Sequence, residues 1–166
     1  MIKLIVCLAL FITFSVMARA KAGNHFQFKG LHVEMKAEEV KKLGISRCRK
    51  PEVVYDEVCS PEPKNKTFAT IGAVPILKMD IIIKKTYVKM IYIETLGAFW
   101  DELSSAMKIQ YGKPTEISRD GLSYRWDKEL EFLSATVQNG KTVIIYGIDS
   151  TAVRAKERSK KAPKDF

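Results

Sequence analysis

The sequence predicts an α+β protein built from two similar halves, each half being one helix packed on an antiparallel sheet. Three observations lead to this prediction. Two stretches place apolar residues at the three- and four-residue spacing of a helix. Runs of β-branched and aromatic residues follow each of them, and tight-turn signals separate these runs, as expected between antiparallel strands. The predicted order is strand, helix and several strands, then helix and several strands again.

The first twenty residues are typical of a secretory signal peptide and are set apart from the fold. Lys3 provides a positive start, the 13 residues from Leu4 to Val16 are almost wholly apolar, and Ala18-Arg19-Ala20 is a small-x-small cleavage site. The apolar run is shorter than the ~20 residues of a membrane-spanning helix. We therefore expect a periplasmic or secreted protein that begins near Lys21, with an uncleaved anchor as the alternative.

Cleavage would leave 146 of the 166 residues, enough for one domain with a hydrophobic core. We assign residues 21–150 to a single α+β domain, with halves at about 26–94 and 95–150, and residues 151–166 to a basic C-terminal tail. Loss of Lys3 and Arg19 lowers the formal net charge from +9 to +7.

The tail holds much of the positive excess, in Arg154, Lys156, Arg158, Lys160, Lys161 and Lys164. Two interpretations stay open for it. One is a solvated chain end, because chain ends are often poorly ordered. The other is a polyanion-binding segment for an anionic envelope surface, such as lipopolysaccharide or anionic lipid.

The first half opens with a strand and a short helix. Residues alternate between apolar and polar over 26–33, which predicts a strand. Apolar residues at helical spacing over 35–43 predict a helix of two to three turns, and Gly44 provides its stop. A loop and a second strand, over 52–58, are expected next.

Two long strands are expected to close the first half. A turn cluster with two prolines, at 60–66, precedes a short predicted strand at 67–71. The runs 76–84 and 87–94 then give the strongest strand signals in the chain, because they are rich in β-branched and aromatic residues. Only Lys84-Lys85-Thr86 separates the two runs, which predicts a hairpin.

The second half begins with the clearest helix signal, within 98–114. Gly112 and Pro114 end it, because glycine favours a left-handed stop and proline cannot continue a helix. The apolar face consists of Phe99, Leu103, Ala106, Met107 and Tyr111.

Three strands and a final helical segment complete the predicted second half. Strands are expected at 122–126, 130–138 and 141–148, and Asn139-Gly140 is a strong turn signal between the last two. Asp149 or Ser150 is a suitable cap for one or two last helical turns.

The two cysteines outside the signal peptide, Cys48 and Cys59, predict a disulfide. An even pair in an oxidising compartment favours a bridge over a metal or catalytic site. The bridge would close a loop of twelve residues and stabilise the fold by about 3 kcal/mol. A catalytic thiol would need a histidine partner, and the only candidates, His25 and His32, lie close together near the start of the domain.

Two stretches carry a resemblance to a known group of proteins. Gly30 to Gly44 (GLHVEMKAEEVKKLG) resembles the opening shared by small bacterial envelope proteins, with Glu34 where that group usually has glycine. The group includes the small lipoprotein of the outer-membrane β-barrel assembly machine and the secreted β-lactamase-inhibitor proteins. Phe99-Trp-Asp-Glu-Leu, Tyr111-Gly-Lys-Pro114 and Tyr124-Arg-Trp126 are similar to the second-half pattern of exported proteins of this kind. The resemblance implies a tandem helix-on-sheet fold, and a disulfide after the first helix fits the inhibitor type.

The functional prediction is a non-enzymatic protein-binding module, an inhibitor or a scaffold that acts on another envelope or secreted protein. The sequence holds no phosphate loop, nucleophile elbow or zinc motif, and we expect no cofactor, no metal and no nucleic-acid partner. An antiparallel sheet with helices on one side leaves its other face free to dock a partner. The candidate partner-binding residues are Tyr87, Lys89, Tyr92, Tyr124, Trp126, Lys84 and Lys85. For Tyr124 and Trp126, packing under the second helix is the alternative.

Overall fold

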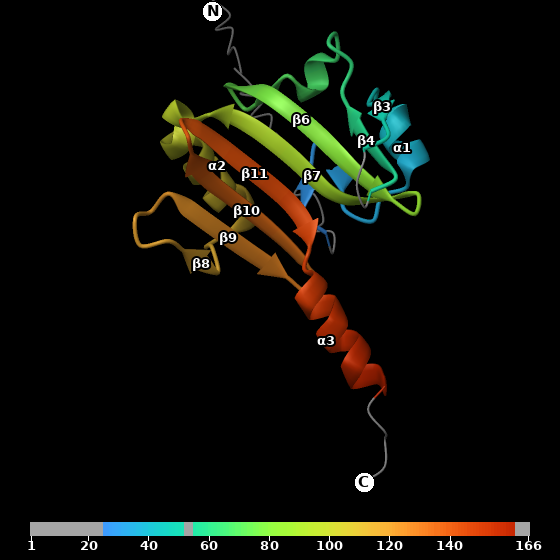
Figure 1. Ribbon diagram of the computed structural model, residues 1–166. Helices are drawn as coiled ribbons and strands as arrows, with labels where there is room; N and C mark the ends of the chain where they lie inside the picture. Colours follow the sequence, from blue (N-terminus) through green and yellow to red (C-terminus); the bar gives the residue numbers. More distant parts are fainter. Residues whose placement is uncertain (1–24, 52–54, 162–166) are drawn as a thin grey trace, which may run out of the picture.

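One large antiparallel sheet forms the body of the protein. The computed structural model describes residues 25–51 and 55–161 (Figure 1). The predicted signal peptide therefore lies outside the described residues. The α+β class is confirmed, because a nine-stranded sheet combines with three α-helices within the described part of the chain. No helix in that part is long and apolar enough to cross a membrane.

The order of the strands mirrors itself about the centre of the sheet. It runs β3-β4-β6-β7-β11-β10-β9-β8, with β5 (Thr70–Ile71) paired to β6 off this path. Strands from the first part of the chain thus occupy one side and strands from the second part the other, and they meet where β7 pairs antiparallel with β11. The bounds are β3 (Arg47–Arg49), β4 (Glu57–Ser60), β6 (Val74–Lys84), β7 (Tyr87–Leu96), β8 (Glu116–Ile117), β9 (Ser123–Lys128), β10 (Glu131–Gln138) and β11 (Lys141–Ile148).

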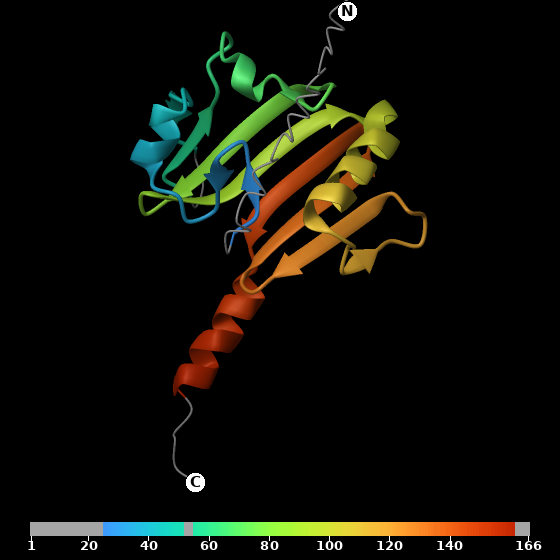
Figure 2. The ribbon, with the colours of Figure 1, turned by 180° about the vertical axis from the view of Figure 1, so that it is seen from behind.

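One face of this sheet is covered and holds the hydrophobic core. The helix α2 (Trp100–Tyr111) and the small hairpin of β1 (Gln27–Phe28) and β2 (Leu31–His32) lie on it (Figure 2). Residues that point to this face alternate along each long strand and are fully buried, as expected for a strand with one covered side. They include Ile81, Ile83, Ile91, Ile93, Leu133, Ala135 and Ile144.

Aromatic rings join the covering elements to the sheet. Tyr111 at the end of α2 contacts Phe26 and Trp126, with ring centroids 5.6 and 6.4 Å apart. Its hydroxyl donates to the carbonyl of Gln27 at 2.7 Å and lies 3.2 Å from the hydroxyl of Tyr146. Glu131 also fixes the hairpin to the sheet, because its carboxylate accepts a hydrogen bond from the backbone amide of Phe26 at 2.9 Å.

The buried Tyr146 predicts a loss of stability in alkali. Burial raises the pKa of its hydroxyl well above the ordinary value of 10.0 and also raises the pKa of Tyr111. Above pH 10 the unfolded chain therefore releases these protons first, and the free energy of unfolding falls by about 1.4 kcal/mol per pH unit for each such group. We expect Tyr146→Phe to flatten this fall in urea titrations at pH 9, 10 and 11. An equally steep fall in Tyr146→Phe, matching that of the control Tyr87→Phe, would contradict the assignment.

Several predicted elements match the structure. The hairpin predicted around Lys84-Lys85-Thr86 is β6 and β7, joined at Lys85 and Thr86, whose positive φ values of 51° and 64° are those of a tight two-residue turn. The predicted long helix is α2, which ends at Gly112 with φ 83°. The hairpin around Asn139-Gly140 is β10 and β11.

Other predicted elements are wrong in detail. The single strand predicted at 26–33 is the β1–β2 hairpin, because Lys29 and Gly30 both have positive φ and reverse the chain. The run 67–71 begins inside a 3₁₀ turn (Lys66–Phe68) and is a strand only at β5. The structure adds β3 and β8, whose two or three residues are too short to show alternation. The last helix, α3 (Ser150–Lys161), extends for 12 residues, beyond the expected one or two turns.

The first helix is shorter than expected and starts from a left-handed residue. It spans α1 (Ala37–Lys42), six residues, and its only buried residue is Val40. Glu34 precedes it with φ 66°, a conformation that favours glycine.

Candidate binding surface

The face of the sheet opposite α2 and the β1–β2 hairpin carries no helix or strand from the described residues (Figures 1 and 2). We call it the open face. Its side chains follow from strand alternation, since each lies between core residues in sequence. They are Lys78, Asp80 and Ile82 of β6, Met90, Tyr92 and Glu94 of β7, Val143, Ile145 and Gly147 of β11, Phe132, Ser134 and Thr136 of β10, and Ser123, Arg125 and Asp127 of β9.

Tyr92 lies at the centre of the open face and is held by charged neighbours. Its hydroxyl donates to Glu94 at 2.7 Å, and Lys141 donates to the other oxygen of Glu94 at 2.8 Å. The ammonium of Lys78 lies 5.4 Å from the centre of the Tyr92 ring. The hydrogen bond to Glu94, followed by burial, raises the pKa of Tyr92 to about 12, so this hydroxyl stays a donor at neutral pH. The hydrogen bonds from Lys141 and then Tyr92 lower the pKa of Glu94.

A second aromatic residue, Phe132, lies across the sheet from Tyr92. A β-carbon added at Gly147 would lie 2.8 Å from the Phe132 ring, so the missing side chain at Gly147 leaves the space that this ring occupies. The guanidinium of Arg125 covers the ring at 4.6 Å. Arg125 also donates to Asp127 at 2.8 Å and to Asp149 at 3.0 Å. The result is a rigid aromatic and arginine pair, of the kind that dominates binding energy in interfaces.

Asp80 organises the other end of the open face. Although it is a carboxylate in the middle of an apolar strand, only 8% of its surface is exposed. It accepts from the hydroxyl of Ser60 at 2.9 Å and lies 3.5 and 3.3 Å from the charged ends of Arg49 and Lys78. This cluster was not among the predicted sites, although Asp80, the one acidic residue in the run Ile76 to Lys84, was a signal for it.

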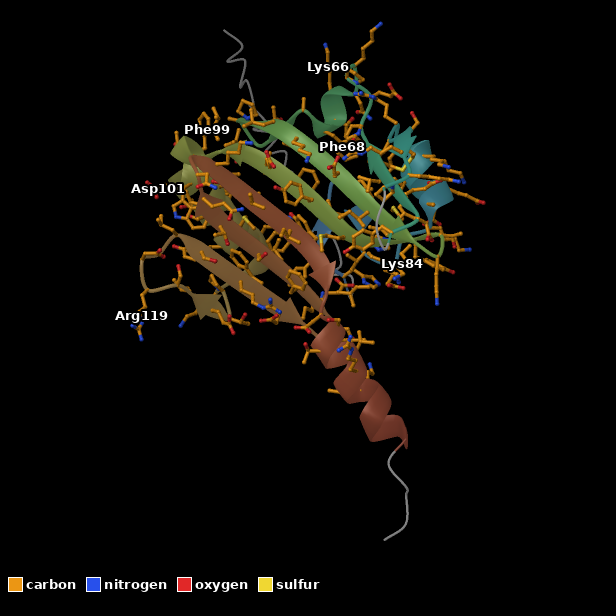
Figure 3. All side chains as sticks on the ribbon, viewed as in Figure 1. Lys66, Phe68, Lys84, Phe99, Asp101 and Arg119 are labelled. Atoms are coloured by element: carbon orange, nitrogen blue, oxygen red, sulfur yellow. A yellow bond between two sulfur atoms is a disulfide. The ribbon has the colours of Figure 1, made fainter. Side chains whose placement is uncertain are left out.

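Five of the seven predicted partner-binding residues lie on the open face or at the end of the sheet near the β6–β7 turn. Tyr92 lies on the open face. Lys84 and Lys85 lie at the tip of the β6–β7 hairpin, where Figure 3 labels Lys84. At the same end, Tyr87 is 36% exposed and Lys89 pairs with Glu34 at 2.6 Å.

The remaining two predicted residues belong to the covered face. Trp126 is only 2% exposed, and its indole nitrogen donates to the carbonyl of Gly112 at 2.9 Å. Tyr124 is half-buried, with its ring 5.0 Å from that of Trp100 on α2. The alternation of β9 turns both residues towards α2, so the expectation that they contact a partner is corrected to a packing role under the helix.

The basic tail begins as the helix α3, which extends away from the sheet (Figures 1 and 2). Asp149 caps its start, accepting from the amides of Thr151 and Ala152 at 2.8 and 3.1 Å. These hydrogen bonds lower the pKa of the Asp149 carboxyl. The side chains of Arg154 and Lys156 are exposed. Of the other predicted cations, Arg158, Lys160 and Lys161 lie along the helix, and Lys164 lies outside the described residues.

The predicted cysteine pair is bonded. Cys48 on β3 lies directly opposite Cys59 on β4, with the Cα atoms 4.0 Å apart and the sulfurs at bonding distance. Glu57 lies close to both sulfurs, and these three side chains are the one cluster of metal-ligand type found among the described residues. Because both sulfurs are engaged in the bridge, the cluster is a structural link between two strands and not a thiolate metal site.

The two histidines lie together, as their sequence positions suggest. Their rings stack with centroids 4.9 Å apart, and Nδ1 of His25 pairs with the buried carboxylate of Glu131. Nδ1 of His32 lies 2.7 Å from the carbonyl of Val33. Within the described chain, no hydrogen bond links a serine, threonine or cysteine to either ring, so the pair holds the β1–β2 hairpin in place without an adjacent nucleophile.

Comparison with known proteins finds no matching family model, no matching curated protein and no matching solved structure.

Proposed function

We propose that this protein is an exported, non-enzymatic binding module that docks another envelope or secreted protein on its open face, as an inhibitor or a scaffold. One observation carries the proposal: a broad sheet surface is left uncovered by the described elements while it presents two ordered aromatic rings, Tyr92 and Phe132, each beside a cation. Tyrosine and arginine are enriched among the residues that contribute most to protein interfaces.

The apolar centre of the open face fits a protein partner better than a small substrate. Ile82, Met90 and Ile145 are neighbours on adjacent strands, and each is half-buried. Ion pairs surround them, so the surface has an apolar middle and a polar rim, as protein interfaces do.

Export is supported by two independent features. The first twenty residues have the composition of a signal peptide, and the Cys48–Cys59 bridge is of a kind that persists in oxidising compartments. Both features support a partner outside the cytoplasm.

We also propose that the two halves of the domain have similar structures. Each half contributes a helix followed by strands, and the sheet order is palindromic about the β7–β11 pair. A two-fold axis perpendicular to the sheet at this pair would exchange the halves and keep both helices on one side. This supports the tandem helix-on-sheet arrangement that the resemblance implies.

The proposal is tested by capture from envelope extract. We expect residues 21–166, immobilised and washed first at low and then at high salt, to retain a single protein, because a packed interface resists screening. Tyr92→Ala should weaken retention at least tenfold. Ile109→Ala is the matched control, since Ile109 is 88% exposed on α2, away from the open face. Equal retention by both variants, or loss of every protein at high salt, would contradict the proposal.

A second candidate function rests on α3. This helix stands clear of the sheet, and the chain from 154 onwards carries six lysines and arginines against Glu157 and Asp165. Such a segment suits an anionic envelope surface. Binding to anionic vesicles that fades steeply with salt, and that disappears when residues 154–166 are deleted, would support this function. The deletion should leave protein capture by the open face unchanged.

A further inference from the structure

A groove of about 700 Å³ lies at the β3–β4–β6 end of the open face. Three cations border it: Arg47 and Arg49 from β3, and Lys78 from β6. Pro61 and Pro63, from the loop after β4, also line it. Figure 3 shows this end of the sheet crowded with side chains near the labelled Phe68, which also lines the groove.

The buried Asp80 pairs with two of these cations, and both keep further hydrogen-bond donors for a ligand. Its Oδ2 atom lies near both Arg49 and Lys78, while its Oδ1 atom accepts from Ser60. The side chains of Arg49 and Lys78 nevertheless remain 69% and 49% exposed. A guanidinium has five N–H donors and an ammonium three, so each retains donors that point away from Asp80.

Arg47 adds a third charge with no internal partner. It is exposed, and no ion pair or hydrogen bond joins its side chain to another described residue. The acidic groups of the groove are Asp80 and Glu62, and Glu62 accepts a hydrogen bond from Ser46 at 2.5 Å. Three cations against two carboxylates leave the groove with one uncompensated positive charge.

We propose that this groove binds a carboxylate side chain on an acidic segment of the partner protein. The inference rests on the proposed function, because the groove is part of the open face. A single excess charge matches one carboxylate, whereas a phosphate dianion would leave one negative charge uncompensated. The exposed fork of Arg49 matches the two oxygens of a carboxylate, and Lys78 is placed to share it. The volume is that of a site for a small ligand or a few residues, not for a whole domain.

The direct test is an NMR titration of residues 21–166 with a hexaglutamate peptide, with hexaglutamine as the neutral probe. We expect saturable shifts of the amides in β3, in the loop after β4 and in the first half of β6, and none with hexaglutamine. The double variant Arg49→Gln/Lys78→Gln should weaken binding at least tenfold. The matched control is Lys113→Gln/Arg119→Gln, which removes the same charge near β8, where Figure 3 labels Arg119.

Three results would overturn the assignment. The first is equal weakening by the control pair, and the second is shifts concentrated in α3; both indicate non-specific attraction to a basic protein. The third is inorganic phosphate binding more tightly than hexaglutamate, which would make the groove a phosphate site.

Partner capture separates this inference from the proposed function. If Tyr92→Ala loses the captured partner and Arg49→Gln/Lys78→Gln retains it, the groove is not a partner site, but the open face remains one. Hexaglutamate shifts without any captured partner keep the carboxylate site and overturn the proposed function.

Discussion

Replacing Trp126 with alanine is expected to lower the free energy of unfolding by about 3–5 kcal/mol, as for other buried aromatic residues. The indole is 2% exposed and packs between the rings of Tyr111 and Tyr124 beneath α2. Its removal leaves a cavity that these two rings cannot close without moving the helix. Because small domains are stable by only about 5–15 kcal/mol, the loss is a large part of the total.

Urea denaturation followed by circular dichroism measures this effect. Ile109→Ala is the control, because it also removes a large apolar side chain from the region of α2, but from the solvent side. We expect it to change stability by no more than about 0.5 kcal/mol. A loss below about 1 kcal/mol in Trp126→Ala would show that the indole is not part of a tightly packed core.

Removing the disulfide is expected to cost about 3 kcal/mol. In the double variant Cys48→Ala/Cys59→Ala, the loop between the two strands is no longer closed in the unfolded chain. β3 then keeps its backbone pairing with β4, at the edge of the sheet, and the ion pair between Arg49 and Asp80. Since β3 carries Arg47 and Arg49, the same variant should weaken hexaglutamate binding through loss of order at the groove.

Reductant provides the control for this variant. Wild-type protein should lose the same stability when reduced, whereas the double variant should not respond to reductant at all. Intact-mass spectrometry should show a gain of two hydrogens on reduction of the wild-type protein. Two free thiols in protein exported to an oxidising compartment would contradict the bridge.

The elements predicted well from the sequence are those that depend on neighbours along the chain. The β6–β7 and β10–β11 hairpins have long β-branched runs on both sides of a two-residue turn, and α2 combines the helical spacing of Leu103, Met107 and Tyr111 with a glycine stop. Each of these signals is complete within about twenty residues. The pairing of Cys48 with Cys59 is predictable because the domain contains only these two cysteines.

The parts missed are those that depend on residues far apart in sequence. β8 has two residues, and it exists because Glu116 and Ile117 find partners on β9. The Asp80 cluster combines residues of β3, β4 and β6, so no pattern within one stretch of the sequence predicts it. The alternation around Trp126 predicts its strand, but it does not specify which side of that strand α2 covers.

The mirrored strand order has a consequence for how the chain folds during synthesis. β7 is complete once Leu96 has been made, but its neighbour β11 begins only at Lys141. Until those last residues arrive, the ten residues of β7 form the exposed edge of a half-sheet, open to pairing with another copy. β11, which covers this edge, is the last strand of the sheet to be synthesised. We therefore expect a chain that ends before β11 to aggregate.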